Sequence, residues 1–263
     1  MAHGMDLGWW VGKAWHAASG AREPMCMASC TRQLARRNDT VVLVVGVSTM
    51  RFLYAGLLGV LRVPHRYPHH RLARSDPCAF EHIGWPRSGP CVRKWRGPCA
   101  EAGCVFAKRW HRLRLLFAWW RNKLPLRLPV GRADLLLAST GVWEAINQKN
   151  VTRYRAAVAE NAHRLLSSVR YDRAILFSNG VCRAAQRLFF ERNFTGWPTV
   201  AMERRVLDGN AQLARVAAAR GVVYFDRGPS MLTGNDTTSP CMLHHPYGKA
   251  SELHARFALA HLA

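Results

Sequence analysis

The chain has 263 residues, 49% of them hydrophobic, and it carries a formal net charge of +22. This length suits one large α/β domain or two small ones, and the hydrophobic share is ordinary for a protein with a buried core. No apolar run reaches the roughly 18–20 residues of a membrane span, because the nearest one, Val41–Leu61, contains Ser48, Thr49 and Arg51.

The sequence begins without periodicity and then becomes strongly apolar. Residues 1–37 are polar and unperiodic, and we expect a loose segment there. Val41–Val47 is entirely apolar and rich in β-branched residues, which predicts a strand covered on both faces. Gly46 permits a sharp turn after this strand. Thr49–Leu61 then has the apolar spacing of a helix.

Residues 62–104 interrupt this pattern with a stretch rich in basic residues, cysteine, proline and glycine, which we interpret as an insertion. Half of the eight cysteines lie in it, at Cys78, Cys91, Cys99 and Cys104. Local disulfide bonds would help to order such a stretch, although eight cysteines leave the pairing open. Zinc is the weaker alternative, because the stretch has no paired Cys-x-x-Cys motifs. We therefore expect no metal and no cofactor.

Strands and helices alternate through the rest of the chain. Residues 105–122 favour a strand, with a short amphipathic helix as the alternative. Further buried strands are predicted at 133–139, 173–178 and 221–226, and helices at 151–169, 184–192, 206–220 and 247–262. This order predicts an α/β protein, a three-layer sandwich with a mainly parallel central sheet. Residues 38–263 would form that single domain.

The charge is concentrated in one part of the chain. Of 38 basic residues six are lysine, and residues 62–127 hold 15 basic residues against three acidic ones. A cationic surface attracts phosphates, acidic polysaccharides or anionic lipid. The alternative is an arginine-rich coding bias without a binding role.

Glycosylation sequons indicate the compartment. Asn38, Asn150, Asn193 and Asn235 each begin an Asn-x-Thr sequon. Together with the cysteines, they predict a glycoprotein with disulfide bonds in the secretory pathway, in the Golgi lumen or outside the cell. Residues 1–29 lack the 7–15-residue apolar core of a signal peptide, so either a leader is missing from this sequence or the lumenal interpretation is wrong.

Polar residues with chemical potential follow the predicted strands. These are Ser48, then Ser139-Thr140-Gly141, then Asn179-Gly180, and finally Asp226. In a parallel sheet the carboxyl ends of the strands meet at one edge, where ligands bind. A serine in a strand–turn–helix corner is exposed there, and amides opening the helix can stabilise an oxyanion. His244 and His245 are the candidate bases that such a serine needs.

Each of these residues also has a structural interpretation. Ser48 can be a helix N-cap, whose side chain accepts an amide hydrogen bond. His244 and His245 can lie in a surface turn before Pro246. Asp226 can be a turn residue. The tryptophans Trp119, Trp120 and Trp143 fit a core better than a ligand platform.

The order of these motifs resembles that of a known superfamily. Gly46-Val-Ser48-Thr-Met-Arg51 resembles the Gly-Asp-Ser-x-x-Arg block of SGNH/GDSL hydrolases. Ser139-Thr-Gly141-Val-Trp143 is similar to the Asn-x-Gly-x-Trp block of the PC-esterase branch, which includes trichome-birefringence-like and Cas1p-type glycan O-acyltransferases. Gly221–Asp226 resembles a later strand ending in aspartate, and Ser239–Gly248 resembles the histidine-bearing loop before the last helix.

The resemblance implies a flavodoxin-like SGNH fold and assigns roles to these residues. Ser48 would be the nucleophile and His244 or His245 its base. The oxyanion hole would come from Thr49, Ser139 and Gly141. The resemblance is incomplete, because Val47, Ser139 and Cys241 stand where the superfamily has Asp, Asn and Asp. Asp236, eight residues before His244, is the nearest candidate for the acid that orients the histidine.

The sequence supports three hypotheses for the function of this protein. The first is an O-acyl (acetyl) esterase or acyltransferase that acts on carbohydrate through Ser48, with weakened activity as one variant. The second is a catalytically degenerate relative that binds an acidic polysaccharide on residues 62–127. The third is a basic nucleic-acid-binding protein, which is disfavoured because no nucleic-acid-binding motif is present.

Overall fold

A computed structural model describes residues 9–11, 14–16, 28–63, 105–120, 128, 130–180, 200–228 and 249–262. At its centre is a six-stranded sheet with the order β4-β5-β3-β6-β7-β8. The strands are β3 (Thr40–Gly46), β4 (Val105–Trp110), β5 (Leu113–Trp119), β6 (Arg132–Ala138), β7 (Arg170–Phe177) and β8 (Val223–Phe225). β4 pairs antiparallel with β5, and every other neighbouring pair in this sheet is parallel. A separate two-stranded sheet joins β1 (Trp9–Val11) to β2 (Ala14–His16).

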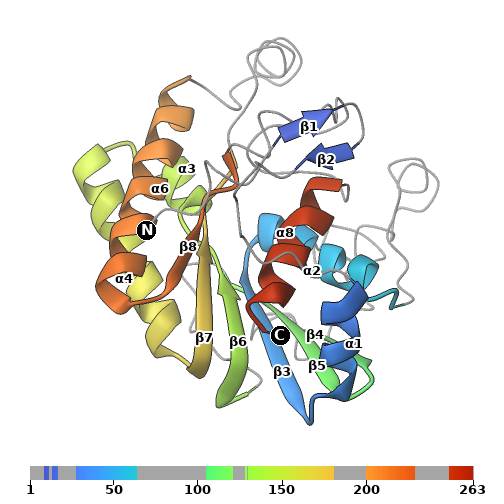
Figure 1. Cartoon of the computed structure of the whole chain (residues 1–263). Helices are drawn as coiled ribbons and strands as arrows, with labels where there is room; N and C mark the ends of the chain where they lie inside the picture. Colours follow the sequence, from blue (N-terminus) through green and yellow to red (C-terminus); the bar gives the residue numbers. More distant parts are fainter. Residues whose placement is uncertain are drawn as a thin grey trace, which may run out of the picture.

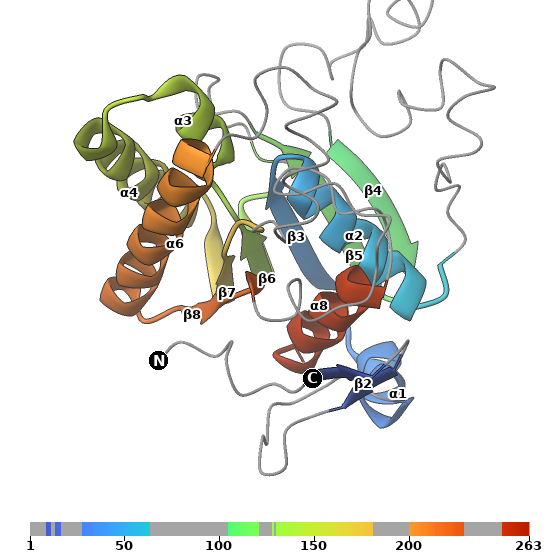
Figure 2. The same cartoon turned by 90° about the horizontal axis from the view of Figure 1, so that it is seen from above.

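Helices cover both faces of the central sheet (Figure 1). On one face lie α3 (Val142–Asn147), α4 (Val151–Ser167) and α6 (Val200–Arg220). On the other lie α1 (Ala28–Arg36), α2 (Ser48–Val60) and α8 (Lys249–Ala260). The view from above separates the two helical layers (Figure 2). The predicted three-layer α/β sandwich with a mainly parallel sheet is therefore confirmed.

β3 is the central strand of this arrangement, and its sequence explains why. All seven of its residues are buried. Val41, Leu43 and Val45 pack into the core under α4 and α6, whereas Val42 and Val44 pack into the core under α2 and α8. A strand between two helical layers needs apolar side chains on both faces, as this run supplies.

Two segments of the chain differ from what the sequence predicted. Residues 105–122 form a strand hairpin, β4 and β5, and the amphipathic helix considered as an alternative is absent from its described residues 105–120. Within residues 1–37, where we expected a loose segment, α1 forms because Cys30 and Leu34 share one face and pack into the α2–α8 core. Residues 64–104 and the helix predicted at 184–192 lie outside the described residues.

α8 runs opposite to the strands and lies directly on α2. Its Phe257 ring is 4.3 Å from Phe225 at the end of β8, and the carbonyl of His261, beyond its last turn, accepts a hydrogen bond from Arg173 of β7. A Cβ built on Gly56 of α2 would lie 2.3 Å from the carbonyl oxygen of Ser251. The amino end of α8 is therefore directed toward the carboxyl edge of the sheet.

Candidate functional site

The corner between β3 and α2 is built around a glycine. Gly46 has φ +150°, and a Cβ there would lie 2.6 Å from Met50 Cγ and 2.9 Å from the carbonyl oxygen of Ser139. A side chain at this position would be strained and would push apart the ends of β3 and β6. Glycine therefore allows the two strand ends to approach closely.

α2 begins at Ser48, and Val47 is its N-cap in extended conformation. The structural interpretation of Ser48 as the N-cap is therefore wrong, since Val47 occupies that position and makes no side-chain capping hydrogen bond. The amides of Met50 and Arg51 donate to the Val47 carbonyl at 2.9 and 3.2 Å. The amides of Ser48 and Thr49 come before the first intrahelical hydrogen bond and lie at the positive end of the helix dipole.

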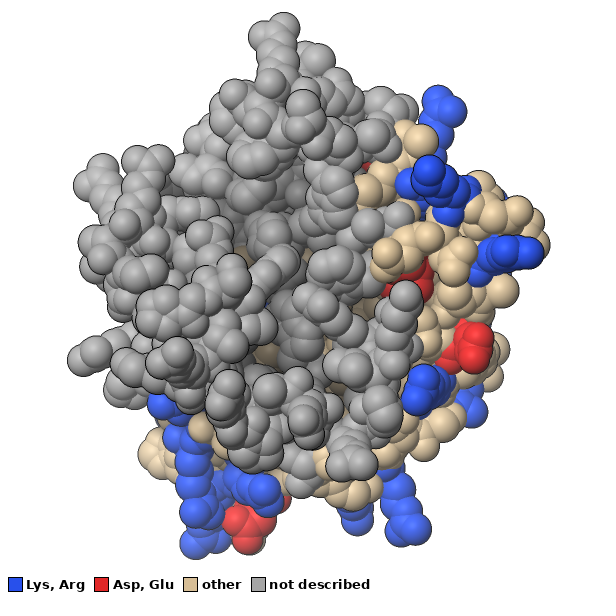
Figure 3. All heavy atoms as spheres, turned by 180° about the vertical axis from the view of Figure 1, so that it is seen from behind, with Lys and Arg blue, Asp and Glu red and all other residues tan. Residues whose placement is uncertain are grey.

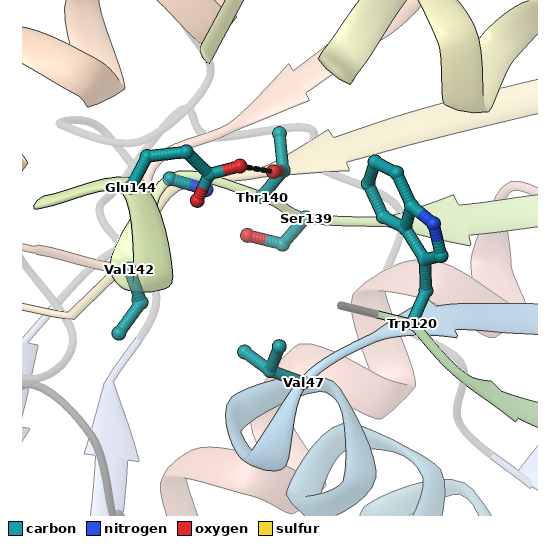
Figure 4. A pocket seen from close by; sticks show the side chains of 7 residues that line it. Val47, Trp120, Ser139, Thr140, Val142 and Glu144 are labelled. Atoms are coloured by element: carbon teal, nitrogen blue, oxygen red, sulfur yellow. Dashed lines mark hydrogen bonds between the residues drawn. The ribbon is translucent and has the colours of Figure 1, made fainter. Parts of the chain in front are cut away.

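A small recess lies beside this corner, where the chain leaves β3 and β6 (Figure 4). It is lined by Val47, Trp120, Ser139, Thr140, Gly141, Val142 and Glu144. The chain leaves β3 through α2 on one face and leaves β6 through α3 on the other, so the recess lies at the point where the connections diverge. Ligands of open α/β sheets bind at such points.

The turn after β6 is held by a buried glutamate. Glu144 of α3 accepts hydrogen bonds from Thr140 Oγ1 at 2.7 Å, from the Gly141 amide at 2.9 Å and from Asn161 Nδ2 at 2.6 Å. Its side chain is buried, so these three donors satisfy a carboxylate that water does not reach. Asn161 belongs to α4, and the network therefore fixes the turn against the helical layer.

A second buried network joins this turn to the end of β7. Asn179 Nδ2 donates to the Thr140 carbonyl at 2.7 Å, and Ser139 Oγ donates to Asn179 Oδ1 at 3.3 Å. Asn210 of α6 accepts from the Asn179 amide at 2.8 Å and donates to its carbonyl at 2.9 Å. The residues that follow β6 and β7 are thus tied to each other and to α6.

These networks occupy two of the amides that were expected to form an oxyanion hole, those of Ser139 and Gly141. The Gly141 amide is occupied by Glu144, and the Ser139 amide donates to the Val45 carbonyl at 3.3 Å. Neither amide is free to bind an oxyanion in this arrangement. The Thr49 hydroxyl is buried and has no hydrogen-bond partner in the described part of the chain. The amides of Ser48 and Thr49, which open α2, have no acceptor within the helix.

The end of β8 carries structural polar groups. Asp226 Oδ1 accepts from Ser178 Oγ and from the Gly228 amide, both at 2.9 Å, so Asp226 acts as a turn residue. The next side chain, Arg227, is buried above the Phe177 ring and donates to Met50 Sδ at 2.7 Å. Burial lowers the pKa of Arg227 to about 9.

The structure brings some of the predicted residues together. Val47, immediately before Ser48, lines the recess together with Ser139 and Gly141. The candidate bases His244 and His245 and the candidate acid Asp236 lie outside the described residues. α8 follows this histidine loop, and its amino end is directed toward the carboxyl edge of the sheet.

The sequence analysis did not identify Glu144 or Asn161 as site residues. The position of Asn161 could have been recognised, because it is a polar residue between the apolar positions Val158, Ala162 and Leu165 on the buried face of α4. Its partner Glu144 lies 17 residues earlier, on another helix. Within the described residues no group of three or more His, Cys, Asp or Glu side chains is arranged to hold a metal ion, and no described helix is long and apolar enough to cross a membrane.

No family model matches the chain, and no curated protein is significantly similar to it in sequence. Among solved structures, it is similar to a catalytic mutant of an acetylxylan esterase from Geobacillus stearothermophilus, at 11% identity and TM-score 0.43 over 86% of this chain and 94% of that one. An aryl esterase from M. smegmatis is similar at 14% identity and TM-score 0.40, over 84% of this chain and 97% of that one. An extracellular lipase from Streptomyces rimosus has 12% identity and TM-score 0.38, over 83% and 97%. Similarities of this size carry no conclusion about the activity of this chain.

Proposed function

We propose that this protein is a serine-dependent O-acyl (acetyl) esterase or acyltransferase that acts on carbohydrate. The observation that carries the proposal is the Ser48 corner. It opens α2 at the carboxyl edge of a mainly parallel sheet, beside a recess lined by residues that directly follow β3 and β6. The motif order described above, with its resemblance to PC-esterases, supports carbohydrate as the carrier of the acyl group.

In the proposed reaction, Ser48 Oγ attacks the carbonyl carbon of the ester while His244 or His245 takes its proton. Asp236 is the candidate for orienting that histidine. The sugar hydroxyl leaves with the proton and an acyl-serine remains. Water resolves this intermediate in an esterase, and a second sugar hydroxyl resolves it in a transferase.

The negative oxygen that forms on the carbonyl would be stabilised by the start of α2. The Ser48 and Thr49 amides have no acceptor within the helix, and the helix dipole favours negative charge there. The Ser139 and Gly141 amides would play a structural part, since both already have acceptors.

An active-site-directed serine reagent tests the proposal. We expect a fluorophosphonate to label the full chain once and to abolish hydrolysis of p-nitrophenyl acetate and of an acetylated oligosaccharide. Ser48→Ala would abolish both labelling and hydrolysis, whereas Ser168→Ala, at the end of α4, would change neither. A wild-type chain that is folded but neither labelled nor active would refute the proposal.

A second candidate is a catalytically degenerate protein of the same fold that binds an acidic polysaccharide. It is favoured by the occupied amides of Ser139 and Gly141 and by the exposed basic side chains of the β4–β5 hairpin, Lys108, Arg109, Arg112 and Arg114. Figure 3 shows more Lys and Arg than Asp and Glu on the described part of one face of the molecule. Retention on a sulfated-polysaccharide column that falls with salt and with charge removal at these four positions, without serine labelling, would support this candidate.

A further inference from the structure

Exposed arginines gather at the amino edge of the central sheet, which lies at the opposite end of the strands from the Ser48 corner. The parallel strands begin at this edge, and α1, α4 and α6 end there, in the lower part of Figure 1. The exposed arginines of the amino edge are Arg36, Arg109, Arg112, Arg114, Arg132, Arg164, Arg170 and Arg220.

Acidic side chains offset little of this charge. Among the described residues of the amino edge they are Asp39, Asp134 and Asp172. Asp39 lies 3.6 Å from Arg109 and Asp172 lies 2.8 Å from Arg132, while Asp134 accepts a hydrogen bond from the Val41 amide at 2.8 Å. The other arginines have no carboxylate partner within the described part of the chain, so the edge is strongly cationic.

Helix stability accounts for only part of this arrangement. Arg36, Arg164 and Arg220 lie in the last turns of α1, α4 and α6, where a cation interacts favourably with the helix dipole. Arg112 lies in the turn between β4 and β5, and Arg132 is the first residue of β6. Neither of these two follows a helix end. The charge therefore extends beyond what the helix ends require.

The arginines are spread over an area rather than along a line. Those of the β4–β5 turn, β6 and β7 follow the sheet, and those of α1 and α4 lie in the two helical layers that Figure 2 separates. Figure 3 shows Lys and Arg side chains projecting from the lower rim of the molecule on both sides. A linear polyanion contacts a row of cations, whereas a lipid surface meets a whole edge at once.

Arginine suits the headgroups of such a surface. Its planar guanidinium donates two parallel hydrogen bonds to a phosphate or a carboxylate. Each basic residue close to an anionic lipid surface adds to binding, and the attraction falls off within a Debye length. Several exposed arginines on one edge therefore act together when that edge faces the lipid.

We infer that the amino edge of the sheet is a docking surface for a membrane that contains anionic phospholipid. Docking of this edge directs the carboxyl edge, with the Ser48 corner and the recess, away from the lipid. The inference does not depend on the proposed function, because it uses neither Ser48 nor the recess.

Cosedimentation of the full chain with vesicles tests the inference. We expect binding to mixed vesicles of phosphatidylcholine and phosphatidylserine, weakening as salt is added, and no binding to vesicles of phosphatidylcholine alone. The edge variant carries Arg36→Gln, Arg164→Gln and Arg170→Gln. These side chains are exposed, so the variant should fold, which thermal unfolding checks. Its partition onto the mixed vesicles should fall by about 10-fold or more.

A control variant removes the same charge elsewhere. Lys149→Gln, Arg153→Gln and Arg204→Gln change exposed residues before α4 and near the beginnings of α4 and α6, toward the carboxyl edge. Because charges far from the lipid are screened, its partition should fall by about 2-fold or less. Equal losses in the two variants would overturn the inference, since net charge alone would then explain binding.

Hydrogen exchange read by mass spectrometry gives the orientation. With mixed vesicles, the amides of residues 111–112 and 168–170 should exchange more slowly, and those of residues 148–150, toward the carboxyl edge, should be unchanged. Protection of residues 148–150 alone would overturn the assigned edge. Retention on a sulfated-polysaccharide column without any binding to the mixed vesicles at low salt would overturn the lipid as the partner.

Discussion

The backbone amide of Gly141 donates a hydrogen bond to the Glu144 carboxylate at 2.9 Å, across the first turn of the helix that follows β6. Gly141 has φ +113°, and a Cβ there would lie 3.0 Å from Asn179 Nδ2. The turn is thus held from one side by a carboxylate and closed from the other by an asparagine. It forms a rigid wall of the recess but offers no free amide from Gly141.

Replacing Glu144 should destabilise the whole fold. Glu144→Ala leaves buried Thr140, Gly141 and Asn161 donors without their acceptor. Since each such loss costs about 1–3 kcal/mol, we expect the free energy of unfolding to fall by about 3 kcal/mol or more. Urea denaturation measures it. Glu160→Ala, at an exposed position of α4, is the control and should stay within about 0.5 kcal/mol of wild type. Equal effects of the two substitutions would contradict the role of the network.

Two buried tyrosines should respond in opposite ways to loss of the hydroxyl. Tyr54 OH donates to the Leu115 carbonyl at 3.3 Å, whereas Tyr154 OH is buried against Gly209 without a hydrogen-bond partner among the described residues. Tyr54→Phe should lower the free energy of unfolding by about 1 kcal/mol, and Tyr154→Phe should leave it unchanged or raise it. Burial raises the pKa of both phenols, so both should resist ionisation in a spectrophotometric titration until the chain unfolds. A destabilised Tyr154→Phe would show that its hydroxyl has a partner.

The α2–α8 contact depends on the absence of a side chain at Gly56. In Gly56→Ala the new methyl group would meet the Ser251 carbonyl oxygen at 2.3 Å, so the helices must move apart. We expect a loss of about 1–3 kcal/mol in stability from this overpacking. Because α8 follows the loop that carries His244 and His245, any esterase activity should fall with it.

Gly131→Ala provides the matched comparison for this helix contact. A Cβ at Gly131 has nothing within 4 Å, and this variant should be as stable as wild type or slightly more so. Thermal unfolding of both variants gives the result. Equal melting temperatures would mean that α2 and α8 do not approach as closely as described.

Asn150 should carry a glycan if the chain enters the secretory pathway, as we propose. Its side-chain oxygen accepts from the Arg153 amide at 3.0 Å and caps α4, while the residue remains exposed. Glycosylation uses the side-chain nitrogen, so capping and modification are compatible. Expression in a secreting eukaryotic host followed by enzymatic deglycosylation should reveal a mobility shift that is smaller in Asn150→Ser.

The choice of substitution separates the two roles of Asn150. Asn150→Ser removes the sequon and keeps a good N-cap, whereas Asn150→Ala removes both and should cost about 1 kcal/mol in protein made without glycans. The same mobility for wild type and Asn150→Ser would show that Asn150 is not modified.

The sequence alone predicted the strands β3, β6, β7 and β8 of the sheet and the position of the serine corner. Val41–Val47 predicted β3 because seven consecutive apolar residues require cover on both faces, and β3 indeed lies between two helical layers. The strand ends at Ser48, Ser139 and Asn179 were expected at one edge because parallel strands end together. The strand register places them there.

Only the tertiary structure showed which side chains from distant segments of the chain are in contact. Asn161 and Glu144 meet across two helices, and Gly56 meets Ser251 across 195 positions of sequence. Local periodicity reports which face of an element is apolar, but it does not report which polar group lies opposite. The family resemblance implied Gly141 as an oxyanion donor, whereas in the folded chain the Gly141 amide donates to Glu144 at 2.9 Å.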